Sequence, residues 1–138
     1  MAGYSGTPLP KKLGIKEGSR VALVGGPEDF ADALGELPAG VTLHTSLAAA
    51  RGLFDVVVWF VSRRSEFERR LPQIRRHMTP AAGVWVSWPK KASGVVTDMS
   101  ENVIREVALP TGLVDNKVCA VDETWSGLRL VIRLEHRR

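Results

Sequence analysis

The fold is decided by the stretch Asp55-Val56-Val57-Val58-Trp59-Phe60-Val61. It is almost continuously apolar and rich in β-branched residues, which is typical of a strand covered on both faces. A strand of this kind lies at the centre of a mostly parallel sheet that has helices on both faces. We therefore expect a three-layer α/β fold.

Five further segments predict strands. Three short apolar runs lie at residues 20–24, 41–43 and 84–88. Two more lie at residues 117–121 and 128–134, and the second of these alternates apolar with more polar positions. The turn between the last two strands is too short for a crossover helix, so we expect a C-terminal antiparallel hairpin.

Helices are expected between the strands, because apolar residues recur there at helical spacing. They are predicted at residues 27–37, 65–78 and 98–109. One or two helical turns are predicted at residues 46–52, and a turn at residues 79–83. Strand–helix alternation of this kind connects parallel strands by right-handed crossovers.

Two capping boxes are expected to start the second and third of these helices. Ser65 pairs with Glu68, and Asp98 pairs with Glu101, at the spacing in which each side chain bonds the other residue's backbone N–H. Pro72 is expected to bend or divide the helix in which it lies.

Length and composition predict one domain. The chain has 138 residues, of which 44% are hydrophobic and 25% charged, with a formal net charge of +4. Residues 1–18 are expected to form an N-terminal arm and residues 19–138 a single domain. Cys119 is the sole cysteine, which excludes an internal disulfide. No run reaches the roughly 18–20 apolar residues of a membrane span, so we expect a cytoplasmic location without a membrane partner.

Several partner classes find little support in the sequence. The three histidines are scattered without ligand spacing, so no metal site is expected. The arginines of residues 63–76 could track phosphates, but Glu66 and Glu68 interrupt them and no nucleic-acid motif accompanies them. A solvated helix face is therefore expected in place of a nucleic-acid surface. A protein partner or a homodimer stays open, through this helix or the edge of the hairpin.

A candidate site follows the strand at residues 84–88. The strand stops at Pro89 and opens into a loop with Lys90 and Lys91. Ligands of open α/β sheets bind just beyond the carboxyl ends of the strands, and a helix start offers free N–H groups to anions. We expect an anion or nucleotide-type ligand there. The candidate residues are Lys90, Lys91, Ser93, Gly94, Asp98, Arg63, Trp88 and Trp125. The alternative is that the lysines are solvated and Asp98 only caps its helix.

Three stretches resemble the Rossmann-like methyltransferase fold, with one strand–helix unit missing. Leu13-Gly14-Ile15-Lys16-Glu17-Gly18-Ser19-Arg20-Val21 resembles the approach to the first strand of that family. Met78-Thr79-Pro80-Ala81-Ala82-Gly83-Val84 resembles a later helix-to-strand turn, and residues 116–131 resemble the closing hairpin. The resemblance implies S-adenosylmethionine as a cofactor candidate and methyl transfer as an alternative function.

The chain departs from that family where the cofactor would bind. The family has an acidic-x-glycine-x-glycine loop after its first strand, whereas this chain has Val24-Gly25-Gly26-Pro27-Glu28. The family also has a carboxylate at the end of its second strand, where this chain offers His44 and Thr45. These departures favour a binding protein over an enzyme.

The chain also resembles an uncharacterised family of short bacterial proteins, mainly actinobacterial, that is known only as a domain of unknown function. The shared stretches include Tyr4-Ser5-Gly6-Thr7-Pro8-Leu9, Trp88-Pro89-Lys90-Lys91-Ala92-Ser93-Gly94 and Asp115-Asn116-Lys117-Val118-Cys119-Ala120-Val121. This resemblance implies the same fold in a bacterial, cytosolic setting and brings no activity with it.

Three functional hypotheses remain open after the sequence. The first is a small Rossmann-like binding protein with an anionic ligand beside Lys90 and Lys91. The second is a methyltransferase-type enzyme with a degenerate cofactor loop. The third is a protein-interaction module or homodimer.

Overall fold

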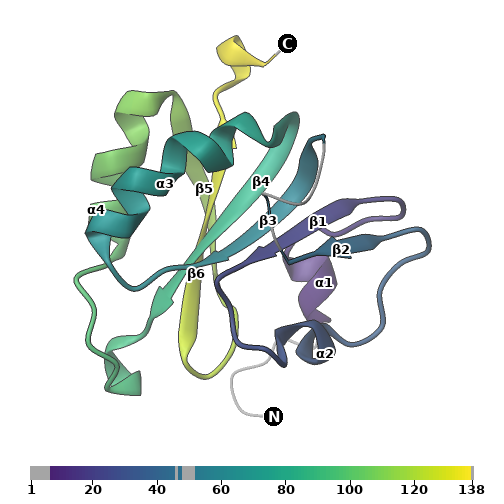
Figure 1. Cartoon of the computed structure of the whole chain (residues 1–138), viewed down its shortest axis with the longest axis horizontal. Coiled ribbons are helices and arrows are strands. Elements are labelled where there is room, and N and C mark those ends of the chain that lie inside the picture. Colours follow the sequence, from purple (N-terminus) through teal and green to yellow (C-terminus); the bar gives the residue numbers. More distant parts are fainter. Residues whose placement is uncertain (1–6, 46, 48–51, 138) are drawn as a thin grey trace.

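The computed structural model describes residues 7–137, apart from residue 46 and residues 48–51. Its centre is one six-stranded sheet with the order β2-β1-β3-β4-β6-β5 (Figure 1). The strands are β1 Arg20–Val24, β2 Thr42–His44, β3 Phe54–Phe60, β4 Met78–Pro89, β5 Leu113–Ala120 and β6 Trp125–Ile132. The helices are α1 Leu9–Lys12, α2 Phe30–Leu34, α3 Arg64–Arg76 and α4 Glu101–Ala108. Three short 3-10 turns are η1 Lys91–Ser93, η2 Leu109–Thr111 and η3 Leu134–His136.

The sheet is mostly parallel, and its C-terminal hairpin is antiparallel, as the sequence predicts. Strands β2, β1, β3 and β4 pair in parallel. Strand β6 lies antiparallel between β4 and β5. The strand expected to be central, β3, is almost wholly buried between β1 and β4. The expected three-layer α/β fold is therefore confirmed.

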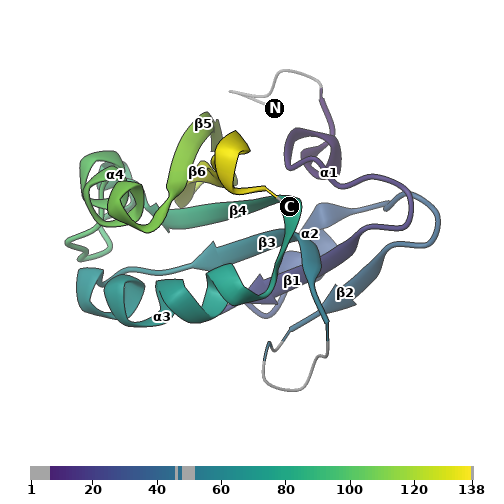
Figure 2. The ribbon, with the colours of Figure 1, turned by 90° about the horizontal axis from the view of Figure 1, so that it is seen from above.

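Two apolar clusters cover the two faces of the sheet. Alternate residues of β3 contribute to different clusters, because successive side chains of a strand point to opposite faces. One cluster packs Phe67 and Leu71 of α3 and Ile104 of α4 against the sheet. The other packs Leu13, just beyond α1, and residues of α2 against the opposite face. Figures 1 and 2 show α3 and α4 grouped together, on the other side of the molecule from α1 and α2.

The starts of α3 and α4 differ from the expected capping boxes. Helix α3 begins at Arg64 and has no side-chain cap of its own, so Ser65 lies inside it. The backbone N–H of Arg64 donates instead to Asp98 Oδ1, at 2.7 Å. Helix α4 is capped by Ser100, whose Oγ accepts from the N–H of Val103 at 3.2 Å. Asp98 therefore caps the neighbouring helix rather than its own.

Two expectations about the segment between α3 and β4 also need correction. Helix α3 continues undivided through Pro72 to Arg76. The residues expected to form a turn at 79–83 belong to β4. In the pairing with β3, Phe54 lies opposite Met78 and Val56 opposite Gly83, so the four intervening residues of β4 bulge out of register. The bulge takes up the residues that the sequence assigns to a turn.

Residues 9–15 of the expected arm pack against the sheet. Leu13 and Ile15 are buried, and Trp85 Nε1 of β4 donates to the Leu13 carbonyl oxygen at 2.9 Å. The division into an arm and a domain stays a prediction. The helical turns expected at residues 46–52 fall largely outside the described residues. Within the described chain, no helix is long and apolar enough to cross a membrane.

Candidate functional site

Four of the eight candidate residues lie together in the turn that follows β4. The turn is closed by its own polar groups: Ser93 Oγ donates to the Lys90 carbonyl oxygen at 2.6 Å and accepts from the N–H of Val95 at 3.2 Å. The N–H of Lys90 donates to the Thr124 carbonyl oxygen at 2.8 Å, which ties the turn to the β5–β6 hairpin. Gly94 closes η1 in the left-handed conformation. Ser93 therefore has a structural role, and Lys91 is exposed at the surface.

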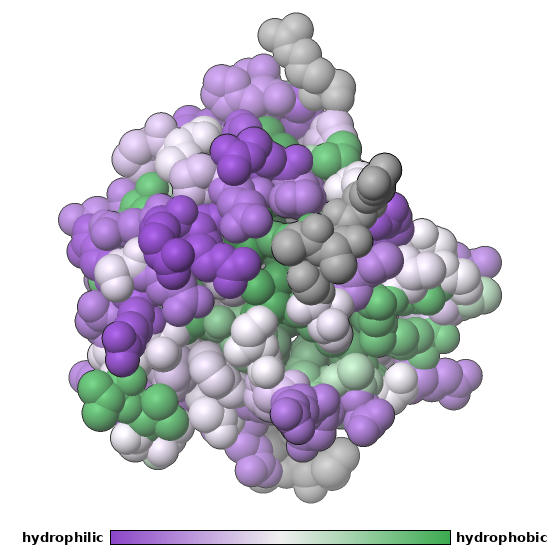
Figure 3. Space-filling view, in the orientation of Figure 1, coloured by the Kyte–Doolittle hydropathy of each residue, from purple (hydrophilic) through white to green (hydrophobic). Residues whose placement is uncertain are grey.

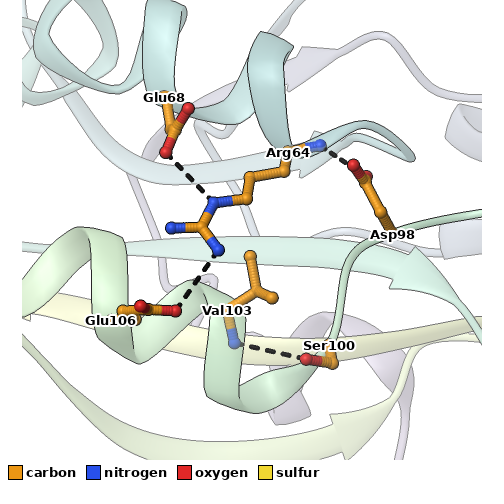
Figure 4. Close-up of polar contacts among 6 residues, drawn as sticks. All are labelled: Arg64, Glu68, Asp98, Ser100, Val103 and Glu106. Atoms are coloured by element: carbon orange, nitrogen blue, oxygen red, sulfur yellow. Dashed lines mark hydrogen bonds and ion pairs between the residues drawn. The ribbon is translucent and has the colours of Figure 1, made fainter.

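Asp98 belongs to a separate cluster at the start of α3 (Figure 4), and Arg63 is the residue that precedes this helix. Asp98 accepts the N–H of Arg64, and the neighbouring Thr97 Oγ1 donates to the Ser62 carbonyl oxygen at 2.6 Å. The side chain of Arg64 lies between Glu68 at 3.1 Å and Glu106 at 3.3 Å, and its pKa is raised by these carboxylates. A helix N-terminus attracts anions. Here the chain's own Asp98 occupies that position.

The two candidate tryptophans lie on opposite faces of the sheet. Trp88 is 9% exposed and packs in the cluster with α3 and α4. Trp125 lies opposite Pro89, one residue further along β4, and packs its ring edge-on against Phe60 at 5.0 Å in the other cluster. The two rings therefore do not flank one ligand. The anion site at Lys90 and Lys91 stays a prediction, without an enclosing set of side chains.

The glycines after β1 lie against the end of β3. A Cβ atom on Gly26 would lie 2.5 Å from the Phe60 ring, and one on Gly25 would lie 2.9 Å from the Phe60 carbonyl oxygen. The Phe60 ring also contacts Phe30 of α2 edge-on, with a centroid distance of 4.9 Å. The two glycines thus make room for an aromatic cluster. The next strand, β2, ends at His44, whose ring packs against Phe54 at 5.3 Å.

A cavity of about 400 Å³ lies at the opposite edge of the sheet, where the parallel strands begin. Its walls are the segment after α1, the first residues of β3 and β4, and the middle of β5 and β6. Four of its residues are cations and two are carboxylates. The lining residues are Lys12, Gly14, Lys16, Glu17, Gly18, Ser19, Asp55, Ala81, Lys117 and Arg129. We call it the Arg129 cavity.

Arg129 lies on the face of the sheet that α1 partly covers. It is opposite Trp85 on β4 and opposite Lys117 on β5, and side chains opposite each other share a face. The guanidinium lies on Gly83, where an added Cβ would overlap Arg129 Nε and lie 2.7 Å from Cζ. The absence of a side chain at Gly83 therefore lets Arg129 lie flat against the sheet.

The guanidinium of Arg129 is partly buried, and its surroundings lack an acidic partner within the described part of the chain. Among the residues that the structure describes, no carboxylate forms an ion pair with it. Burial and the neighbouring charge of Arg137 both lower the pKa of Arg129. The positive charge is therefore partly withdrawn from water and repelled by a neighbour.

The two carboxylates of the cavity do not neutralise this charge. Asp55 is held by other groups: its Oδ2 accepts from the N–H of Arg20 at 2.8 Å, and its Oδ1 accepts from Thr79 Oγ1 at 3.4 Å. Glu17 is exposed. With Lys16 and Lys117 also on the wall, the cavity has the chemistry of an anion site. The described residues contain no group of three or more side chains suited to hold a metal ion.

The expected solvated face of α3 is visible on the surface. Figure 3, in the orientation of Figure 1, shows mainly hydrophilic residues over the region of α3. Its exposed arginines include Arg69 and Arg76, and Glu68 stands among them. The expectation that nucleic acid does not bind here stays a prediction.

The sheet order defines the class of fold. A protein described as a type 11 methyltransferase from Sulfolobus solfataricus superposes with a TM-score of 0.67 at 13% identity, over 94% of this chain and 92% of its own. A SAM-dependent methyltransferase from Aquifex aeolicus gives 0.55 at 17% identity, over 89% and 87%. Aeropyrum pernix fibrillarin, solved with natively bound S-adenosyl-L-methionine, gives 0.60 at 12%, over 94% and 70%. The fold is therefore a Rossmann-like methyltransferase fold.

The family is shown by a match along most of the chain. A family model described as a protein of unknown function, DUF3052, matches residues 10–134. The chain belongs to this family. A comparison with curated proteins finds no match. The resemblance to methyltransferases is thus confirmed for the fold, and the resemblance to a family of unknown function is confirmed for the family.

The residues at the carboxyl edge do not fit the cofactor loop of the methyltransferase resemblance. That loop needs open glycines and a carboxylate at the end of the next strand. Here the ring of Phe60 lies on Gly26, and β2 ends at His44. The cavity with unpaired charge is at the other edge. The sequence did not single out its residues, because they become neighbours only through the register of β4, β5 and β6.

Proposed function

We propose that this protein binds a small anionic ligand in the Arg129 cavity and does not transfer methyl groups. One observation carries the proposal. The guanidinium of Arg129 is partly buried, lies in the notch above Gly83 and has no acidic partner among the described residues. A charge removed from water without a partner destabilises a fold. A bound anion would supply the missing counter-charge.

The shape of the group indicates which anions suit it. A guanidinium presents a planar fork of N–H donors that matches the two oxygens of a carboxylate or phosphate group. Lys117, directly opposite on β5, and Lys16 would add further positive charge. A volume of about 400 Å³ suits a small molecule. Glu17 and Asp55 on the same wall would repel a long polyanion, so we infer a compact ligand with two negative charges.

Thermal unfolding tests this proposal with three probes: inorganic phosphate, malonate and ATP, at constant ionic strength. The variants are Arg129→Met and the double variant Lys90→Gln with Lys91→Gln. A ligand at about 100 times its Kd adds roughly 2.7 kcal/mol of stability. We expect malonate to raise the Tm of the wild type and of the double-lysine variant, and to leave that of Arg129→Met unchanged. We expect phosphate to raise the Tm of the wild type more than that of Arg129→Met.

The choice of variants separates binding from folding. Methionine is unbranched and flexible, so it can lie over Gly83 without a charge. We expect Arg129→Met without added anion to be at least as stable as the wild type, because it removes an unpartnered charge. The double-lysine variant removes more positive charge than Arg129→Met, so it controls for non-specific attraction. If Arg129→Met still bound the anion and the double-lysine variant did not, the site would lie at the carboxyl edge of the sheet, beside Lys90 and Lys91. No shift with any probe would overturn anion binding.

A second candidate function is S-adenosylmethionine-dependent methyl transfer. The observation that favours it is the fold, which this chain shares with proteins such as Aeropyrum pernix fibrillarin. The packing of Phe60 on Gly26 speaks against it. Calorimetric titration with S-adenosylmethionine distinguishes the two candidates. Our proposal predicts no saturable heat, whereas a micromolar Kd would favour the methyltransferase.

A further inference from the structure

A second basic cavity lies beyond the C-terminal end of α3, and it shares no residue with the Arg129 cavity. It is open to the surface and has a volume of about 380 Å³. Three segments meet there: the last turn of α3, the η2 turn after α4, and the residues that follow β6. The lining residues are Arg75, Leu109, Pro110, Thr111, Gly112, Arg133 and His136. Three of these can carry positive charge and none is acidic.

Arg75 is the central residue of this cavity. Its Nε atom is buried and has no hydrogen-bond partner among the residues that the structure describes. Its guanidinium lies beside Gly112, where an added Cβ would be 3.6 Å from the Nη2 atom. Buried polar groups in folded proteins nearly always have a partner, so an unsatisfied donor at the wall of a cavity indicates a missing acceptor.

Other arginines of the same face show how the chain usually satisfies such a group. Arg105 of α4 donates to Asp115 at 3.0 Å and to Glu101 at 2.8 Å. Arg64 of α3 contacts Glu68 and Glu106. Among the described residues, no carboxylate forms an ion pair with Arg75. The chain supplies partners for two arginines and leaves this one open toward a cavity.

The neighbours of Arg75 complete a set of donors. The ring of His136 also lies beside Gly112, with Cδ2 3.4 Å from the position of an added Cβ. Arg133 has one acidic neighbour, Glu135, at 3.9 Å, and both side chains are well exposed. An exposed ion pair of that length contributes little, so the guanidinium of Arg133 can turn to a ligand.

We propose that this cavity binds a phosphate group, either free or as the monoester of a small molecule. Two guanidinium groups and an imidazole that line one cavity suit a tetrahedral dianion, because an arginine fork binds phosphate oxygens in pairs. Arg75 and His136 both lie within 4 Å of the position that a Cβ on Gly112 would take. No acidic side chain lines the cavity to repel the anion, unlike in the Arg129 cavity.

Amide ¹H–¹⁵N spectra of the full chain test this site without interference from the Arg129 cavity. Inorganic phosphate and glycerol 3-phosphate are titrated separately at constant ionic strength. The amide of Gly112 reports on this cavity and that of Gly83 on the other. We expect saturable shifts at Gly112 with a Kd of about 1 mM or tighter. Tighter binding of glycerol 3-phosphate would identify a monoester ligand, and equal binding would identify the free ion.

The matched variants are Arg75→Gln and Arg76→Gln, which remove the same charge from adjacent positions of α3. Arg76 is exposed and does not line the cavity. Loss of a charged hydrogen bond predicts about tenfold weaker binding at Gly112 for Arg75→Gln, and no change for Arg76→Gln. Arg133→Gln provides a second variant with the same expected direction. Equal affinity in Arg75→Gln and Arg76→Gln, or no saturable shift at Gly112, would overturn the proposal.

Discussion

Phe60 stands where β3 ends beside the glycines that follow β1. Its ring lies on Gly26 and contacts Phe30 and Trp125 edge-on, which fixes the end of β1, α2 and the β5–β6 hairpin around one side chain. Aromatic pairs of this geometry contribute about 0.5–1.5 kcal/mol beyond the area they bury. At this edge of the sheet, where a cofactor would bind, Phe30 and Trp125 pack against Phe60 and stabilise the fold.

The contact between Gly26 and Phe60 gives a stability prediction. In Gly26→Ala the new methyl group would lie 2.5 Å from the Phe60 ring, so either the ring or the loop must move. Overpacking of this kind costs about 1–3 kcal/mol, which denaturant unfolding would measure. In the double variant Gly26→Ala with Phe60→Leu, the smaller leucine side chain leaves room for the new methyl group. The loss in free energy of unfolding should therefore be smaller than the sum of the losses in the two single variants. Full additivity would show that the methyl group never meets the ring.

The structure divides the arginines into paired and unpaired groups. Arg64 and Arg105 have carboxylates within 3.3 Å. Arg75 and Arg129 lie against Gly112 and Gly83, without an acidic partner among the described residues. Each guanidinium lies beside a glycine and next to a cavity, and at Gly83 an added Cβ would overlap it. The two proposed anion sites rest on this difference between residues of the same type.

The start of α3 is the element that differs most from its sequence pattern. Asp98 accepts the N–H of Arg64 across 34 positions of the chain (Figure 4). A carboxylate at a helix N-terminus contributes about 1 kcal/mol through its hydrogen bond and the helix dipole. We expect Asp98→Ala to lower the free energy of unfolding by about this amount, and Ser65→Ala to leave it unchanged within about 0.5 kcal/mol.

Chemical denaturation of both variants measures this difference, with Ser100→Ala as the reference for a true side-chain cap on α4. A larger loss in Ser65→Ala than in Asp98→Ala would restore the capping box that the sequence predicts. The sequence pattern misleads at this point for a physical reason. A capping box is a local signal, whereas the cap of α3 comes from a loop that reaches it only after the chain has folded.

The sheet itself was predictable element by element. Apolar runs identified every strand, because burial on one or both faces leaves a periodic mark in the sequence. The bulge in β4 was not predictable, since Thr79-Pro80-Ala81-Ala82-Gly83 has turn composition and its pairing depends on β3. The apolar pattern did not predict that Leu13 and Ile15 pack on the sheet. This packing includes a long-range hydrogen bond from Trp85 Nε1 to the Leu13 carbonyl oxygen, which leaves no mark in the local sequence.

At the scale of the whole molecule, the general rule for α/β sheets predicted a site at the carboxyl edge. Of the candidate residues, Ser93 and Asp98 stabilise turns and helix starts, and Trp88 and Trp125 lie on opposite faces. The cavity with unpaired charge lies where the parallel strands begin. Lys16, Lys117 and Arg129 are distant in sequence, and only the strand register and the packing of α1 bring them together.

The molecule thus combines a methyltransferase fold with an aromatic cluster at the usual ligand edge and a basic cavity at the opposite one. The chain has the sheet order of that fold, and the ring of Phe60 packs where the cofactor loop of that family would lie. The Arg129 cavity and the loop with Lys90 and Lys91 lie at opposite edges of the sheet, so one experiment can show at which edge an anion binds.

The measurement that tests the central claim most directly is a map of amide ¹H–¹⁵N shifts during titration of the full chain with malonate. Our account predicts saturable shifts that centre on Gly18, Gly83 and Lys117, around the Arg129 cavity. Shifts that centre on Lys91 and Gly94, or a spectrum that malonate leaves unchanged, would contradict it.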